Sequence, residues 1–103
     1  MGYYTDFKLD CAVPDDVVIP DGLDYDGKTT KEFLSRGELY DMKWYEHIND
    51  MLKVSLANPD IEFHTSGIGE EQGDQWECLF LNGKYKKVVA KITFENFNDV
   101  GWK

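Results

Sequence analysis

Cysteine, histidine and basic side chains are scarce in this chain, and long apolar runs are missing. Only two of its 103 residues are cysteines, Cys11 and Cys78, and only two are histidines. Two distant cysteines outside any CxxC spacing indicate neither a zinc finger nor a disulfide scaffold, so we expect buried, reduced thiols. No stretch approaches the roughly 18 apolar residues of a membrane-spanning helix. We therefore expect no association with a membrane.

Targeting signals are also missing from the N-terminal sequence, MGYYTDFKLD. It has neither the basic region nor the apolar core of a secretory signal, and Asp6 stands where a myristoylation signal requires Ser or Thr. Hydrophobic residues make up 42% of the chain and aromatic residues 15%, a composition that argues against disorder. We expect residues 1–103 to form one intracellular domain.

Negative charge dominates the sequence. Against 11 basic residues stand 20 acidic ones, giving a formal net charge of −9, and residues 1–26 hold seven aspartates against the single basic residue Lys8. An acidic surface repels nucleic-acid phosphates, so direct nucleic-acid binding is not expected. The surface could serve solubility alone, or it could engage a basic partner. The candidate partner-binding residues are Asp15, Asp16, Asp21, Asp24, Asp26, Glu70, Glu71 and Asp74.

The hydrophobic periodicity predicts an α+β fold. Alternating patterns indicate strands over 3–13, 39–45, 61–66, 74–81 and 84–94, and a helical period covers about 46–57. A second, short helix is expected at about 30–36. The order of these elements predicts a single, mainly antiparallel sheet of four to five strands with both helices on one face.

Local signals refine the two helices. Thr29 and Glu32 have the spacing of a capping box at the start of the first helix, and Gly37 is placed to end it. Asn58 and Pro59 should end the second helix. Its buried face is predicted to carry Ile48, Met51, Leu52, Ser55 and Leu56.

The last two strands are joined at Asn82-Gly83, a strong hairpin signal. A two-residue turn would pair Leu81 with Lys84 and would place Val88, Ala90, Ile92 and Phe94 away from Trp76. A continuous buried face instead favours a three-residue turn with a left-handed Gly83. Phe80 would then face Lys84, and Trp76 would lie beside Val88.

No motif identifies a catalytic, metal or cofactor site. His47 and Asp50 could share a proton or a metal on one helical face, but no third ligand is evident. Residues 21–27 resemble a calcium loop, yet with Gly27 at its sixth position the required acids at the first and last positions are missing. Residues 67–74 lack the Lys-Ser/Thr of a phosphate loop. An alternative small-ligand site would use the 67–73 loop with Trp44, His47, His64 and Trp76.

Lysines concentrate near the C-terminus, at Lys84, Lys86, Lys87 and Lys91. With Tyr85 among them they could form a basic and aromatic strip for nucleic acid, but lysines on an outer strand also prevent association between sheet edges. The acidic character of the whole chain favours the second role, protection of the sheet edge. Trp102 either packs against the domain or is an exposed interaction handle.

Three motifs carry a resemblance to a known family. They are Met-Gly-Tyr-Tyr-Thr at the N-terminus, Trp-Tyr-Glu-His at 44–47, and Gly-Ile-Gly-Glu-Glu-Gln-Gly-Asp-Gln-Trp at 67–76, followed by Asn-Gly-Lys at 82–84. The chain resembles small uncharacterised proteins that are common in bacteriophages and mobile regions of bacterial genomes. The match covers residues 1–9 and about 42–97, whereas 14–38 depart from the pattern. The resemblance implies a phage origin and a host-cytoplasmic location, but no activity.

These expectations lead to a hypothesis about function. The chain would be a non-enzymatic inhibitor that occludes a basic, nucleic-acid-binding surface of a host factor, such as a defence complex, in the manner of an anti-CRISPR protein. Alternatives are a small-ligand binding protein or enzyme that uses the 67–73 loop, and a phage structural or assembly component. A homodimer is compatible with each of the three.

Overall fold

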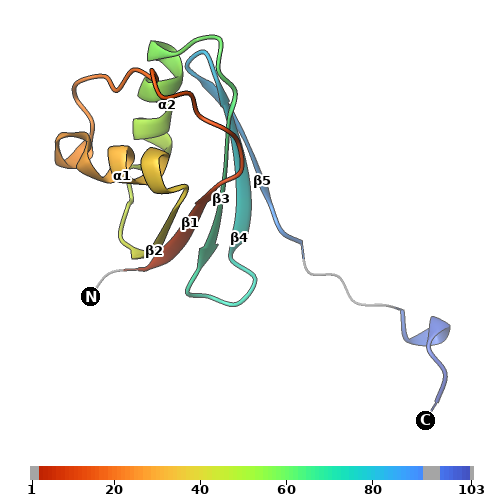
Figure 1. The fold of residues 1–103 in the computed structure, drawn as a ribbon. Helices are drawn as coiled ribbons and strands as arrows, with labels where there is room; N and C mark the ends of the chain where they lie inside the picture. The colour runs from red at the N-terminus through yellow and green to blue at the C-terminus, as the bar shows by residue number, and fades with distance from the viewer. Residues whose placement is uncertain (1–2, 92–95, 103) are drawn as a thin grey trace.

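The computed structural model describes residues 3–91 and 96–102 and confirms the α+β fold. Two α-helices accompany one antiparallel sheet with the strand order β2-β1-β3-β4-β5 (Figure 1). The helices are α1 (Lys28–Arg36) and α2 (His47–Ala57). The strands are β1 (Thr5–Leu9), β2 (Glu38–Met42), β3 (Phe63–Gly69), β4 (Gln75–Leu81) and β5 (Lys84–Val89). Within the described residues, no helix has the length and hydrophobicity needed to cross a membrane.

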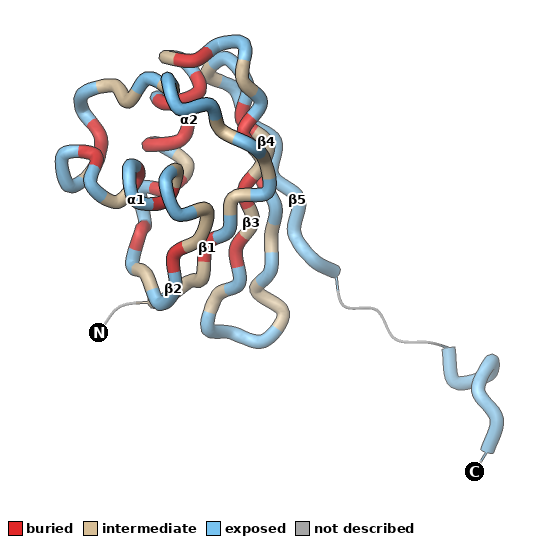
Figure 2. The backbone as a smooth tube through the Cα atoms, in the orientation of Figure 1, coloured by how far each residue is buried: buried red, intermediate tan, exposed pale blue. Residues whose placement is uncertain are grey.

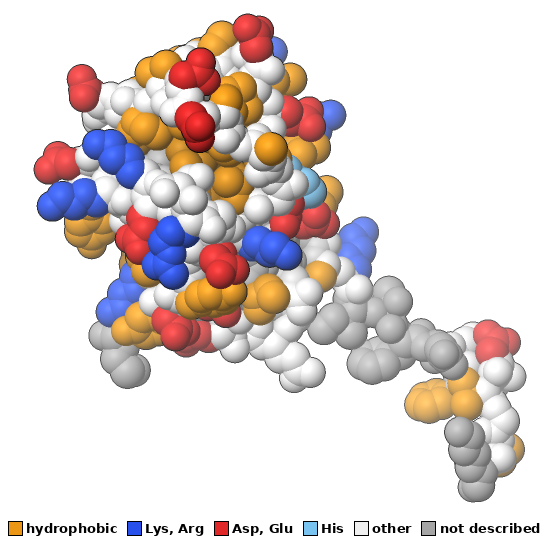
Figure 3. Space-filling model, in the orientation of Figure 1, with side chains coloured by type: hydrophobic (Ala, Val, Ile, Leu, Met, Phe, Trp, Pro, Cys, Tyr) orange, Lys and Arg blue, Asp and Glu red, His pale blue; other side chains and the backbone are white. Residues whose placement is uncertain are grey.

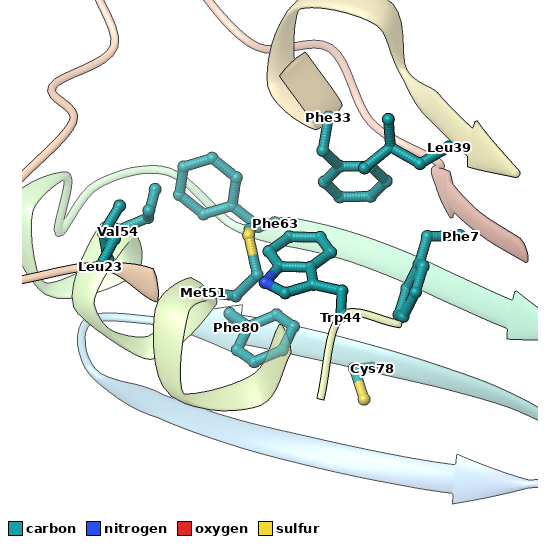
Figure 4. Close-up of a cluster of buried hydrophobic side chains, with 10 residues drawn as sticks. All are labelled: Phe7, Leu23, Phe33, Leu39, Trp44, Met51, Val54, Phe63, Cys78 and Phe80. Atoms are coloured by element: carbon teal, nitrogen blue, oxygen red, sulfur yellow. The ribbon is translucent and has the colours of Figure 1, made fainter. Parts of the chain in front are cut away.

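Both helices pack on the same side of the sheet (Figure 1). β1 pairs with both β2 and β3, so α2 connects two strands that are separated by β1. α1 packs against β1 and β2, and α2 packs against β4 and β5. The core lies between these helices and the sheet (Figures 2 and 4), and its buried hydrophobic side chains are Phe7, Leu23, Phe33, Leu39, Trp44, Met51, Val54, Phe63, Cys78 and Phe80.

The other side of the sheet has no helix on it, and we call it the open face. Side chains alternate along each strand, so the neighbours of buried residues point to this face. In β3, Phe63 and Thr65 are buried on the helix side, and His64 between them points to the open face. In β4 the same alternation places Glu77 beside the buried Cys78.

Several predicted boundaries need correction. β1 is shorter than the predicted 3–13, and β3 begins later and runs further than the predicted 61–66. β2 ends at Met42 rather than Tyr45, because Asp41 has a left-handed φ of 52° that breaks the alternation. Trp44 therefore lies in the loop before α2 and not in a strand. The predicted continuation of the last strand over 92–94, like Met1 and Gly2 of the resemblance motif, lies outside the described residues.

The start of α1 also differs from the capping-box prediction. The helix begins at Lys28, and its N-cap is Gly27, which has a φ of 77° and provides no side-chain cap. Thr29 therefore lies within the first turn instead of before it. Gly37 ends the helix with a left-handed φ of 81°, as predicted.

The β4–β5 hairpin has the two-residue turn that the sequence argument rejected. Leu81 pairs with Lys84, and Trp76 pairs with Val89. Asn82 and Gly83 have φ values of 48° and 75°, which a two-residue hairpin turn with two left-handed positions requires. The three-residue turn was expected on the premise that the apolar side of the last strand is buried. β5 is instead an edge strand, and all six of its residues are exposed.

The buried face of α2 is rotated from the predicted one. Met51 and Ser55 are buried as expected, but Leu56 is 63% exposed. The other buried positions of the helix are His47, Asp50 and Val54. Two of these three residues are polar, and their hydrogen-bond partners explain why they lie inside.

Candidate functional site

The predicted acidic residues at 15–26 lie in a loop that runs into a short 3₁₀ helix (Asp24–Gly27), and we call residues 15–26 the acidic segment. Asp15, Asp16, Asp21 and Asp26 are exposed, and Asp24 is half-buried. No Lys or Arg nitrogen of the described residues lies within ion-pair distance of these carboxylates. The nearby Lys53 directs its Nζ to the carbonyl oxygen of Gly22, at 2.7 Å. The segment therefore presents five carboxylates without ion pairs to the described lysines and arginines, and the Lys53 ammonium binds its backbone.

Contacts with the core hold the acidic segment in place. Asn58 at the end of α2 accepts a hydrogen bond from the Val18 amide at 2.8 Å and donates one to the Val18 carbonyl at 2.8 Å. The side chain of Leu23 is buried in the core, and the Asp24 amide donates to Asp50 Oδ1 at 3.1 Å. An anchored loop loses less conformational entropy on binding than a free one. The carboxylates are thus displayed on a partly preorganised loop.

Glu70, Glu71 and Asp74 lie in the β3–β4 turn, apart from the acidic segment (Figure 1). Two of them bind the N-terminal residues of the chain. Glu70 accepts a hydrogen bond from the Tyr4 amide at 2.7 Å, and Asp74 accepts one from the Tyr3 hydroxyl. The bond to Asp74 is the main cause of the raised pKa of Tyr3. The eight predicted carboxylates therefore form two groups. On the face drawn in Figure 3, acidic and basic side chains are interspersed.

Three of the four residues of the predicted small-ligand site meet in the core. The imidazole of His47 lies 5.0 Å, between ring centroids, from both Trp44 and Trp76, and its Nε2 is 3.1 Å from Thr65 Oγ1. Burial, followed by the charge of Lys87, lowers the pKa of His47 to about 3. The ring is therefore neutral at physiological pH and packs as an aromatic group.

Asp50 does not pair with His47, the partner that the helical spacing offered. Its Oδ2 accepts a hydrogen bond from Trp44 Nε1 at 2.8 Å, and its Oδ1 accepts the Asp24 amide. Asp50 is only 2% exposed, so these two bonds offset the cost of burying its polar atoms. Asp50 therefore links Trp44, in the loop before α2, to the acidic segment.

His64, the fourth residue of that predicted site, lies on the open face. Its Nε2 is 2.8 Å from Glu77 Oε1, and the carboxylate of Asp10 is close by. His64 and His47 are therefore on opposite sides of the sheet, and the four predicted residues do not line one cavity. The sequence argument missed Asp10 and Glu77. Strand alternation could have predicted that Glu77 points to the open face. Its proximity to His64, however, depends on the register between β3 and β4.

The glycines of the 67–73 region make room for neighbouring side chains. A Cβ atom at Gly67 would lie 2.2 Å from Cζ2 of Trp76, and one at Gly69 would meet both Asp74 and the hydroxyl of Tyr3. Close packing of neighbouring side chains therefore explains why both positions are glycine. Gly67 and Gly69 belong to β3, so this region is less of a loop than predicted.

The open face contains a hollow of about 520 Å³. Its lining includes Asp10, Ser66, Gln75, Glu77 and Val88. Comparison with family models, with curated proteins and with solved structures found no match for this chain. The resemblance to phage and mobile-element proteins thus stays a prediction that rests on the three motifs.

Proposed function

We propose that the protein is a non-enzymatic binding protein whose acidic segment engages a basic, nucleic-acid-binding surface of a host protein and occludes it. The observation that carries this proposal is the concentration of carboxylates at 15–26 on an anchored loop, without ion pairs to described lysines or arginines. Exposed carboxylates that have no ion pair within the described residues are available to a partner of opposite sign.

The position of the acidic segment outside the resemblance motifs is consistent with the same assignment. The motifs fall in 1–9 and 42–97, where Tyr3, Trp44 and Trp76 serve packing and hydrogen bonding. The acidic segment belongs to residues 14–38, the part of the chain that departs from the family pattern. A segment that is particular to this chain is a suitable place for a specific partner contact. A phage origin and action against a host defence complex in the host cytoplasm belong to this proposal.

The test compares two variants that remove the same amount of charge. One replaces four exposed aspartates of the acidic segment by asparagine, and the matched control neutralises four exposed acids elsewhere. The first set is Asp15, Asp16, Asp21 and Asp26, and the control set is Asp41, Asp60, Glu62 and Asp99. Partners are captured from host lysate with the wild-type protein, and their affinity for wild type and both variants is then measured by biolayer interferometry.

The proposal expects the affinity for the captured partner to fall steeply between about 0.05 M and about 0.5 M salt, because screening weakens exposed charge pairs. The segment variant should bind far more weakly than the control variant, and nucleic acid should compete with the wild-type protein. Equal affinity of both variants, or binding that is insensitive to salt, would contradict the proposal. Stabilisation by a metabolite in a thermal-shift screen would favour the small-ligand alternative, and co-purification with phage particles would favour the structural one.

A further inference from the structure

Three side chains with metal-binding atoms meet on the open face of the sheet. Asp10 follows β1, His64 belongs to β3 and Glu77 belongs to β4. Each offers one ligand atom, and the three atoms lie within 4.8 Å of one another. His64 Nε2 and Glu77 Oε1 are 2.8 Å apart. Residues that are 67 positions apart in the chain thus converge at one point.

The backbone holds these three residues in adjacent strands. The Asp10 amide donates to the His64 carbonyl at 2.7 Å, which places Asp10 beside β3 just beyond the end of β1. In the β3–β4 ladder Glu77 pairs with Ser66, two residues from His64 and on the same face. Only side-chain rotamers must be ordered when a ligand binds, since the backbones are already fixed.

The chemistry of the three groups suits a divalent transition-metal ion. One imidazole and two carboxylates are ligands that Zn²⁺ accepts at about 2.0–2.2 Å, so ligand atoms around one ion lie roughly 3–3.5 Å apart. Ca²⁺ and Mg²⁺ prefer oxygen ligands alone, whereas an imidazole favours Zn²⁺ and its first-row neighbours. The observed separations require only small rotations of exposed side chains.

We propose that Asp10, His64 and Glu77 form a three-ligand site for Zn²⁺ or a similar divalent transition-metal ion. The site borders the hollow of about 520 Å³ that Asp10 and Glu77 help to line. The net charge of −9 favours a cation at the surface. Lys8 Nζ lies 4.0 Å from Asp10 Oδ1, but its side chain is 70% exposed and can swing into solvent when the ion binds.

The site is separate from the acidic segment, so it does not depend on the proposed function. Its ligands come from the open face, whereas the acidic segment packs against α2 and the core. The variant with four neutralised aspartates in that segment should therefore bind Zn²⁺ with wild-type affinity. Failure of either proposal leaves the other intact.

The experiment is a Zn²⁺ titration of chelator-treated protein by isothermal calorimetry, followed by Co²⁺ substitution monitored by absorption spectroscopy. Wild-type protein should bind one ion per chain. His64→Gln and Glu77→Gln should each weaken binding by at least about tenfold. Glu62→Gln is the matched control, because it removes an exposed carboxylate near His64 that lies outside the three-residue cluster, and it should leave the affinity unchanged.

NMR spectroscopy identifies the ligand directly, since the chain has only two histidines. The imidazole signals of His64 should shift with Zn²⁺, and those of the buried His47 should stay in place. Circular dichroism shows that each variant is folded. Binding that survives His64→Gln would overturn the proposal. So would binding that is lost in Cys11→Ser with a thiolate band in the Co²⁺ spectrum, because Cys11 Sγ lies 3.4 Å from the His64 amide.

Discussion

Acidification should destabilise this protein through His47. Its imidazole is buried among aromatic rings, and burial lowers its pKa from the ordinary 6.5 to about 3. The unfolded chain therefore binds a proton at a higher pH than the folded one does. The contribution of the neutral ring is fully present above about pH 6.5 and is lost as the pH falls toward about 3. Stability should decrease throughout this window.

The magnitude follows from the size of the shift. Each pH unit between the two pKa values costs about 1.4 kcal/mol, so lowering the pH from about 7.5 to about 5 should remove about 2 kcal/mol from the free energy of unfolding. Urea unfolding followed by tryptophan fluorescence measures this loss. In His47→Gln, which has no titrating group at that position, the loss should be smaller by about the same amount.

A matched control separates the proton effect from simple loss of packing. Val54 is fully buried in the same core, and Val54→Ala should lower the free energy of unfolding by about 2 kcal/mol without changing its dependence on pH. If His47→Gln and the wild-type protein lost stability equally between the two pH values, the burial argument for His47 would be refuted.

Three further predictions concern single buried positions, each measured by urea unfolding. Gly67→Ala should cost about 1–3 kcal/mol, because its Cβ would collide with the ring of Trp76, and an unchanged midpoint would contradict this packing. Trp44→Phe should cost about 1–3 kcal/mol by removing the donor to Asp50 Oδ2, and a loss below about 0.5 kcal/mol would speak against that bond. Thr30 Oγ1 is buried without a hydrogen-bond partner among the described residues, so Thr30→Val should add about 1 kcal/mol, and destabilisation would reveal a missing partner.

Periodicity predicted the elements of the fold well but not the side that each one buries. Both helices, five strands and the helix end at Gly37 follow from local pattern. The buried face of α2 follows only in part, because Met51 and Ser55 are buried as predicted but Asp50 is buried as well. Asp50 accepts hydrogen bonds from Trp44 and from the Asp24 amide. Hydropathy treats an aspartate as outward-facing, since it does not register such partners.

The hairpin error has a different cause. The predicted register gives β5 a buried side, but β5 is an edge strand whose residues all stay exposed even though α2 contacts it. The turn residues alone, Asn82 and Gly83, favoured the correct two-residue turn. In this case local turn chemistry was the better guide, because it did not depend on an assumption about tertiary burial.

The residues that carry the resemblance and the residues that carry the proposals are different. Packing and hydrogen bonds inside the domain account for the motif residues. Tyr3 donates to Asp74, Trp44 donates to Asp50, and Gly67 leaves room for the ring of Trp76. Their spacing in the sequence is therefore explained by the fold. A motif that maintains a fold does not by itself indicate a shared activity. The exposed aspartates of the acidic segment lie outside these motifs, and so do Asp10, His64 and Glu77 of the open face. These side chains are therefore where partner and ligand specificity should be sought.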